Sequence, residues 1–226
     1  MSPGFHRLMG AQGLAGLADN ALLLVVIAML IEQSKAAHWI PLLKLGFTLS
    51  YVVLGPWVGR LADAWHKPRV MQWANALKLM AVLSILLGLD VMLAYVWVGL
   101  GAAFYSPAKY GWITEVEPPD RLVHANAWIE VSTVSAAVFG VALGGLLISD
   151  TWTQSQLAQA INAWAWWDSR LGASVVLILG LYVAVAWIQR RIPHSGVPCL
   201  SRGWHLGQVW RDFWIDQKTL WTDPLG

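Results

Sequence analysis

Charged residues are scarce in this chain. Only 12% of its 226 residues are charged and 57% are hydrophobic, whereas about a quarter of an ordinary soluble domain is charged. The net charge of +2 is too small to favour nucleic acid as a partner, and no basic patch alternates with aromatics. The single cysteine, Cys199, excludes an internal disulfide and belongs to no cluster of metal-ligating residues, so we expect neither metal nor cofactor. With a mean hydropathy of +0.53, the composition indicates an integral membrane protein.

Long apolar runs follow one another along the chain. A helix crosses a bilayer with about 20 mostly apolar residues, and we expect six such spans: 10–31, 39–61, 70–89, 91–112, 123–148 and 171–188. The connections are polar, including a charged loop at 62–68. The Trp-rich segment 151–169 is predicted to form an interfacial helix or hairpin. The predicted fold is an all-α integral membrane protein, a bundle of six transmembrane helices.

Lysine and arginine predict the orientation of this bundle. Cytoplasmic loops of membrane proteins carry an excess of these residues. Only Lys35 and Arg170 fall on one predicted face, and Lys44 and Lys78 fall inside spans. The other face, which includes both termini, has the remaining eleven: Arg7, Arg60, Lys67, Arg69, Lys109, Arg121, Arg190, Arg191, Arg202, Arg211 and Lys218. Both termini are therefore expected to be cytoplasmic.

Polar residues inside the spans are the candidate binding residues. If the first span enters the membrane near residue 8, Asp19 lies roughly 16 Å deep at about 1.5 Å per residue, next to Asn20. Lys78 and Glu130 lie at similar depths in the third and fifth spans, and Asn75 is one turn from Lys78. Such residues turn inward to pair or to line a wet path. Both a structural network and a substrate site stay open.

The segment Gly59-Arg60-Leu61-Ala62-Asp63-Ala64-Trp65-His66-Lys67-Pro68-Arg69 is the most specific local pattern. It resembles the loop between the second and third spans of the major facilitator superfamily, in which Gly-x-Leu-Ala-Asp precedes a basic cluster. The resemblance implies that Gly59 and Asp63 belong to a gating motif, with Asp63 against a helix terminus. Lys67 and Arg69 would then keep the cytoplasmic side closed by charge pairing.

Three further motifs narrow the resemblance. Tyr-Ser-Pro-Ala-Lys-Tyr-Gly at 105–111, Ala-Asp-Asn-Ala-Leu-Leu at 18–23 and Asn-Ala-Leu-Lys-Leu at 75–79 are similar to those of bacterial lysophospholipid transporters of that superfamily. Glu-Val-Ser-Thr at 130–133 matches as well. The resemblance implies inward flipping of lysophospholipids across the bacterial inner membrane, with Asp19 and Lys109 contacting the head group. Pro107 is expected to kink the fourth span beside Lys109.

Such transporters have about twelve spans in two halves, and this chain resembles the amino-terminal half. We expect residues 1–190 to form a six-helix bundle and residues 191–226 a cytoplasmic linker with an amphipathic helix around Trp210 and Trp214. The sequence ends where a second half would begin, so it reads as truncated. Its expected partners are membrane lipid, the lysophospholipid substrate, and the missing half or a second copy.

Three alternatives stay open at this stage. The first is a carrier of the same fold for a drug or a sugar. The second is a half-carrier that acts as a scaffold and transports nothing. The third is a membrane-embedded acyltransferase, but the six histidines are scattered and none has the His-four-residues-Asp spacing of lysolipid acyltransferases. We therefore expect the protein not to be an enzyme.

Overall fold

The computed structural model describes residues 1–35, 38–163 and 169–197, and the seven residues 211, 214, 215, 218, 219, 221 and 222. All regular structure within these residues is helical. The elements are α1 (Pro3–Glu32), α2 (Trp39–Ala64), α3 (Lys67–Leu86), α4 (Val91–Val116), the 3₁₀ turn η1 (Pro119–Arg121), α5 (Leu122–Ile148), α6 (Asp150–Thr153), α7 (Gln156–Ala163) and α8 (Gly172–Gln189). The amphipathic helix predicted for the tail falls mostly on residues outside those described.

Each of the six predicted spans lies largely within a helix, but not all are equally apolar. Among the described residues, α1, α4, the η1–α5 unit and α8 are long and apolar enough to cross a membrane, and α2 is a fifth if its two arms form one span. The prediction of six such spans is therefore confirmed only in part. The exception is α3, because Arg69, Gln72, Asn75 and Lys78 interrupt its apolar sequence.

Two predicted boundaries were wrong. Helix α1 begins seven residues early, since Ser2 caps it by accepting a hydrogen bond from the Phe5 amide at 3.1 Å. The predicted loop 62–68 is mostly helix: α2 continues to Ala64 and α3 starts at Lys67. Pro68 occupies the first turn of α3, where a missing N–H breaks no helical hydrogen bond.

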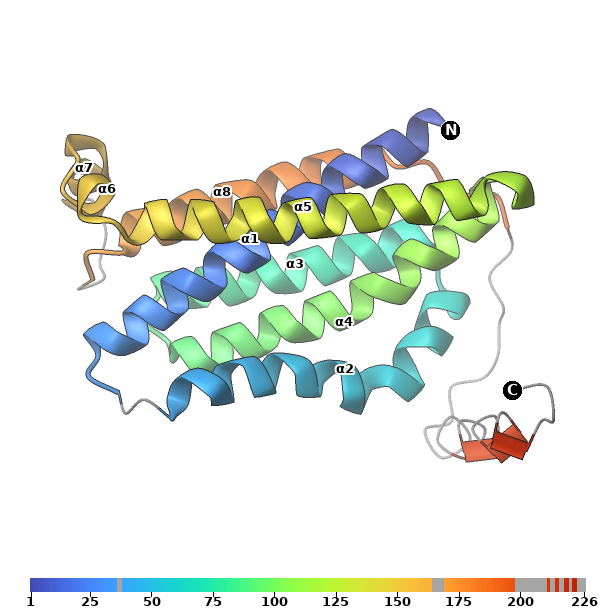
Figure 1. The fold of residues 1–226 in the computed structure, drawn as a ribbon, viewed down its shortest axis with the longest axis horizontal. Coiled ribbons are helices and arrows are strands. Elements are labelled where there is room, and N and C mark those ends of the chain that lie inside the picture. Colours follow the sequence, from blue (N-terminus) through green and yellow to red (C-terminus); the bar gives the residue numbers. More distant parts are fainter. Residues whose placement is uncertain are drawn as a thin grey trace.

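The helices pack as two groups, α1 with α5 and α2 with α3 and α4, and α8 contacts both groups (Figure 1). Helix α1 packs along α5 and α8, while α3 packs along α4 and α8, and α2 lies mainly on α4. Glycines permit the closest approach: a Cβ at Gly140 would lie 2.7 Å from the Leu17 carbonyl of α1. A Cβ at Gly99 of α4 would lie 2.9 Å from the backbone of Phe47 on α2. Such contacts between small residues replace the hydrophobic drive that lipid removes.

Helix α2 contains the sharpest bend described in the bundle. Its arms, Trp39–Gly55 and Trp57–Ala64, meet at 64°. The residue between them is Pro56, which has no backbone N–H to continue the helical ladder. The sequence predicts a kink at Pro107 as well; this residue lies inside α4, which is assigned as one helix from Val91 to Val116, and the kink stays a prediction. In Figure 1 the first arm of α2 runs along the lower edge of the bundle below α4, and the second arm turns upward after the bend.

The short helices α6 and α7 lie at the end of the bundle opposite the N-terminus (Figure 1). Arg170 bridges Glu32 at the end of α1 and Asp150 at the start of α6. Its hydrogen bond and charge interaction with Glu32 raise the pKa of the Arg170 guanidinium above its usual value. The Trp-rich segment thus contains two helices tied to the bundle, and residues 164–168 of it lie outside the described part.

Candidate functional site

A cavity of about 510 Å³ opens among five helices. Helices α1, α2, α4 and α5 form its walls, and α3 contributes one side chain, Lys78. It is lined by Gln12, Gly16, Asp19, Asn20, Leu23, Lys44, Phe47, Thr48, Tyr51, Lys78, Tyr95, Ala102, Tyr105, Ser106, Lys109, Tyr110, Glu130, Thr133 and Ala137. Five of the six polar residues that the sequence singled out as binding residues therefore meet in one space.

Asp19 and Lys78 form an ion pair between α1 and α3. The Lys78 ammonium lies 2.6 Å from one Asp19 oxygen and 2.9 Å from the other. From α8, the buried Tyr182 hydroxyl donates to Asp19 Oδ1 at 2.5 Å. Sequence reasoning missed Tyr182, although a single tyrosine in the middle of the sixth apolar run was a detectable signal. A charge inside the bilayer needs a partner, and Lys78 pairs with Asp19 rather than with Glu130.

The two asparagines predicted to bind substrate have different surroundings. Asn75 is buried and donates to the backbone carbonyl of Tyr182 at 3.0 Å, so its amide faces α8 and it is not part of the cavity lining. Asn20 lines the cavity, and its amide donates to the Gly16 carbonyl one turn earlier in α1 at 2.8 Å. Asn75 thus supports the tyrosine that holds Asp19.

On α4 and α5, Lys109, Tyr110 and Glu130 form a second polar group in the cavity lining. The Lys109 ammonium lies 4.4 Å from the centre of the Tyr110 ring, and the Tyr110 hydroxyl donates to Glu130 Oε1 at 2.7 Å. Lys109 is 5% exposed, whereas Glu130 is open to the cavity. No described residue forms a salt bridge with either charged group. The sequence predicted both charges but not the tyrosine between them.

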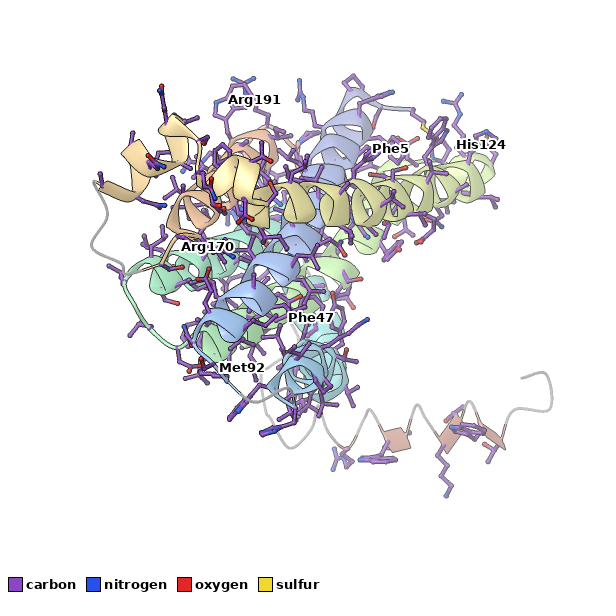
Figure 2. All side chains as sticks on the ribbon, turned by 60° about the vertical axis from the view of Figure 1, so that its left-hand side comes forward. Phe5, Phe47, Met92, His124, Arg170 and Arg191 are labelled. Carbon is purple, nitrogen blue, oxygen red and sulfur yellow. The ribbon has the colours of Figure 1, made fainter. Side chains whose placement is uncertain are left out.

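The remaining wall is aromatic and includes a lysine that the sequence left without a role. Phe47 of α2, labelled in Figure 2, stacks against Tyr95 of α4 with ring centres 5.4 Å apart. Tyr51 lies 5.8 Å from Phe47. Lys44, one turn before Phe47, also lines the cavity. The cavity therefore combines charges of both signs with an apolar, aromatic wall, which suits an amphiphilic ligand.

The predicted gating residues lie at the N-terminal end of the bundle, away from the cavity. The Lys67 ammonium lies 2.7 Å from Glu115 of α4 and 3.6 Å from Asp63 in the last turn of α2. Arg69 and Gly59 are exposed. Glu115 also accepts a hydrogen bond from Ser195, which follows α8. Lys67 therefore links α2, α3 and α4 to the segment after the last long helix.

Comparison with known proteins places this fold in a family. Residues 8–224 match the family model described as Major Facilitator Superfamily. The chain belongs to the Major Facilitator Superfamily. In such transporters, substrates bind near the bilayer midplane between helices, and the cavity of this member also lies between helices.

Several curated relatives share one printed name, "Lysophospholipid transporter LplT". The protein of Cronobacter sakazakii is 34% identical over 97% of this superfamily member, and that of Photorhabdus laumondii is 37% identical over 98%. The protein of Serratia proteamaculans is 45% identical over 88%. The aligned parts make up 51%, 51% and 50% of these relatives. The chain thus spans about half the length of the curated relatives it matches.

Proposed function

We propose that this protein forms the amino-terminal, six-helix half of a lysophospholipid carrier, in which α3 is the sixth membrane-crossing helix. The proposal rests on one observation: a cavity of about 510 Å³ presents charges of both signs beside an aromatic, apolar wall. A lysophospholipid has the same division, with a charged head and a single acyl chain. The names of the relatives at 34–45% identity support this choice of substrate.

Within this cavity, Lys109 is the proposed ligand of the lipid phosphate. Its ammonium is buried against Tyr110, and no carboxylate of the described residues lies within salt-bridge distance of it, although the Glu130 charge acts on it through space. An anionic phosphate would restore the balance of charge, and hydrogen bonds between ions are about twice as strong as neutral ones. Asp19 and Asn20 complete the polar floor on α1.

The proposed setting is the bacterial inner membrane, with both termini in the cytoplasm. The excess of lysine and arginine at the end of the bundle that contains Lys67 and Arg69 supports this orientation. Movement of lipid would come from rocking of two halves around the cavity. The chain by itself is therefore expected to bind lysophospholipid without moving it across a bilayer, and to act as a carrier rather than an enzyme.

Liposomes and nanodiscs test the two parts of this proposal separately. In nanodiscs, a tail-fluorescent lysophospholipid should bind saturably to the wild type and about tenfold more weakly to Lys109→Met, which keeps the side-chain length but removes the charge. In liposomes, the chain alone should leave the probe in the outer leaflet. A fusion to the carboxy-terminal half of the Serratia proteamaculans relative should move the probe inward.

Equal binding by the wild type and Lys109→Met would refute the proposed phosphate site. Flipping by the chain alone would refute the assignment of a half-carrier. A fluorescent sugar or drug that competes fully with the lysolipid at equal concentration would favour a carrier for another class of substrate.

A further inference from the structure

The cavity contains two carboxylates, and their surroundings differ. An ionised carboxylate has room for about four hydrogen-bond donors. Asp19 already accepts three: two contacts from the Lys78 ammonium and one from the Tyr182 hydroxyl. Its charge is neutralised by Lys78, whose own side chain is 4% exposed. A ligand cation would find little free charge on Asp19.

Glu130 presents the opposite case. It accepts one hydrogen bond, from the Tyr110 hydroxyl at 2.7 Å, and its carboxylate is open to the cavity. In the described part of the chain no lysine, arginine or histidine forms a salt bridge with it. Displacing Lys78 from Asp19 would strand a buried charge, which is strongly unfavourable, whereas binding a cation at Glu130 breaks no ion pair.

Tyr110 contacts both Glu130 and the Lys109 ammonium, and the charges of these two groups also act on each other through space. The ammonium lies 4.4 Å from the ring centre, and the hydroxyl at the far end of the ring contacts Glu130. The cavity wall therefore offers a cation over the ring and an anion at the hydroxyl of the same tyrosine. A phosphoethanolamine head group has the complementary order, with a phosphate anion followed by a short linker and a primary ammonium.

We propose that Glu130, rather than Asp19, receives the ammonium of a zwitterionic lysophospholipid head group, while Lys109 receives its phosphate. This inference rests on the proposed function and specifies how the same site selects a head group. Asp19, Lys78 and Tyr182 are then positioning residues, which fix α1 against α3 and α8 behind the cavity. Glu130 determines specificity, because a primary ammonium is charged and has N–H donors for a carboxylate, whereas glycerol hydroxyls carry no charge.

Head-group selectivity in nanodiscs tests the assignment. The full chain is placed in phosphatidylcholine nanodiscs, and binding of tail-fluorescent lysophosphatidylethanolamine and lysophosphatidylglycerol is measured at low salt. Glu130→Gln keeps the size of the side chain and an acceptor for Tyr110 but removes the charge. This variant should weaken binding of lysophosphatidylethanolamine about tenfold and leave binding of lysophosphatidylglycerol unchanged or tighter. The ratio of the two affinities should therefore fall at least tenfold.

Two controls accompany this variant. Asp120→Asn removes an exposed carboxylate outside the cavity and should change the binding affinity for neither lipid. The double variant Asp19→Asn with Lys78→Met removes the ion pair without leaving an unpaired charge. It should affect both lipids by the same factor and leave the selectivity ratio at the wild-type value.

The outcomes separate this inference from the proposal on which it depends. If the wild type binds neither lipid saturably, both the carrier function and the head-group assignment fail. If the wild type binds both lipids but Glu130→Gln weakens them equally, only the assignment to Glu130 fails. If the Asp19 and Lys78 double variant selectively loses binding of lysophosphatidylethanolamine, the head-group ammonium is bound by Asp19 instead of Glu130.

Discussion

Single side chains in the middle of the bundle are held by charge. Lys78 and Asp19 lie on different helices, and each would be costly in the bilayer interior without the other. Tyr182 then fixes the rotamer of Asp19 from α8, and Asn75 fixes the backbone of Tyr182. The pair therefore connects α1, α3 and α8. Its contribution to the stability of the protein can be measured separately from any contribution to ligand binding.

Asp19→Asn should destabilise the protein by about 3 kcal/mol or more, because it leaves the Lys78 ammonium buried and unpaired. The loss should appear as a lower melting temperature of the purified protein in mild detergent. Adding Lys78→Met should recover most of it, since no charge then remains. A double variant no more stable than Asp19→Asn alone would contradict this account of the pair.

Asp90, which caps α4, makes the stability of one end of the bundle depend on pH. Partial burial alone would raise the pKa of its carboxyl, but hydrogen bonds from Lys35 and from the amides of Leu93 and Met92 hold the pKa below its usual value. Because the folded pKa is lowered, the stabilisation is present above the ordinary pKa of aspartate and is lost as pH falls through the folded value.

Lys35→Gln should therefore lower the melting temperature at pH 7. The difference should be smaller at a second, acidic pH below the folded pKa of Asp90, because protonation there removes the charge that Lys35 pairs. The measurement is a melting curve at each pH for wild type and variant. Asp120→Asn, which removes an exposed carboxylate in the α4–α5 loop, is the control for the general effect of pH on an exposed acidic residue. An equal shift at both pH values would contradict the role of the Lys35–Asp90 pair.

At the scale of elements, α1 and α5 meet along a seam of small residues. A Cβ at Gly140 would come within 2.7 Å of both the Leu17 carbonyl and the Asn20 Cβ, and one at Gly144 within 3.0 Å of the Ala21 carbonyl. Backbone atoms cannot rotate away as a flexible side chain can. The seam thus sets the distance between the two helices that carry Asn20 and Glu130.

Gly140→Ala should cost about 1–3 kcal/mol through overpacking, and it should also weaken ligand binding by moving α5. Gly145→Ala is the matched control on the same helix, because a Cβ there has open space within 4 Å. Unfolding in graded sodium dodecyl sulfate, followed by circular dichroism, compares the two. Equal stability of both variants would mean that the seam is loose enough to absorb a methyl group.

The sequence was sufficient to predict most elements but not how they face one another. Apolar length predicted the helices, and depth arithmetic put Asp19, Lys78 and Glu130 at one level. Periodicity does not reveal which helix each face meets, so neither Tyr182 nor Tyr110 was predicted as a partner of a carboxylate. The boundary at 62–68 was wrong because charge and proline resemble a loop, although Pro68 fits the first turn of a helix.

At the scale of the whole molecule, the two ends of the bundle differ in character. The N-terminus and the α2–α3 and α4–α5 connections lie together at one end, and α6 and α7 lie at the other (Figure 1). The first end holds Lys67, Arg69 and Arg121. By the distribution of basic residues, that end is expected to face the cytoplasm.

Cysteine labelling tests this orientation. In a Cys199→Ser background, Ala160→Cys on α7 should react with a membrane-impermeant maleimide added to intact spheroplasts, because α7 would face outward. Val197→Cys, which is also exposed, should react only after the membrane is permeabilised. The reverse pattern would invert the proposed topology.

The polar sequence of α3 has a consequence for how the protein is made. A helix with Lys78 at its centre and Arg69, Gln72 and Asn75 before it enters lipid poorly by itself. Its partner, Asp19, is synthesised about 60 residues earlier, so α1 would already be in the bilayer when α3 leaves the ribosome. We therefore expect α1 to stay beside the translocon until α3 emerges, so that the two charges enter the membrane as a neutral pair.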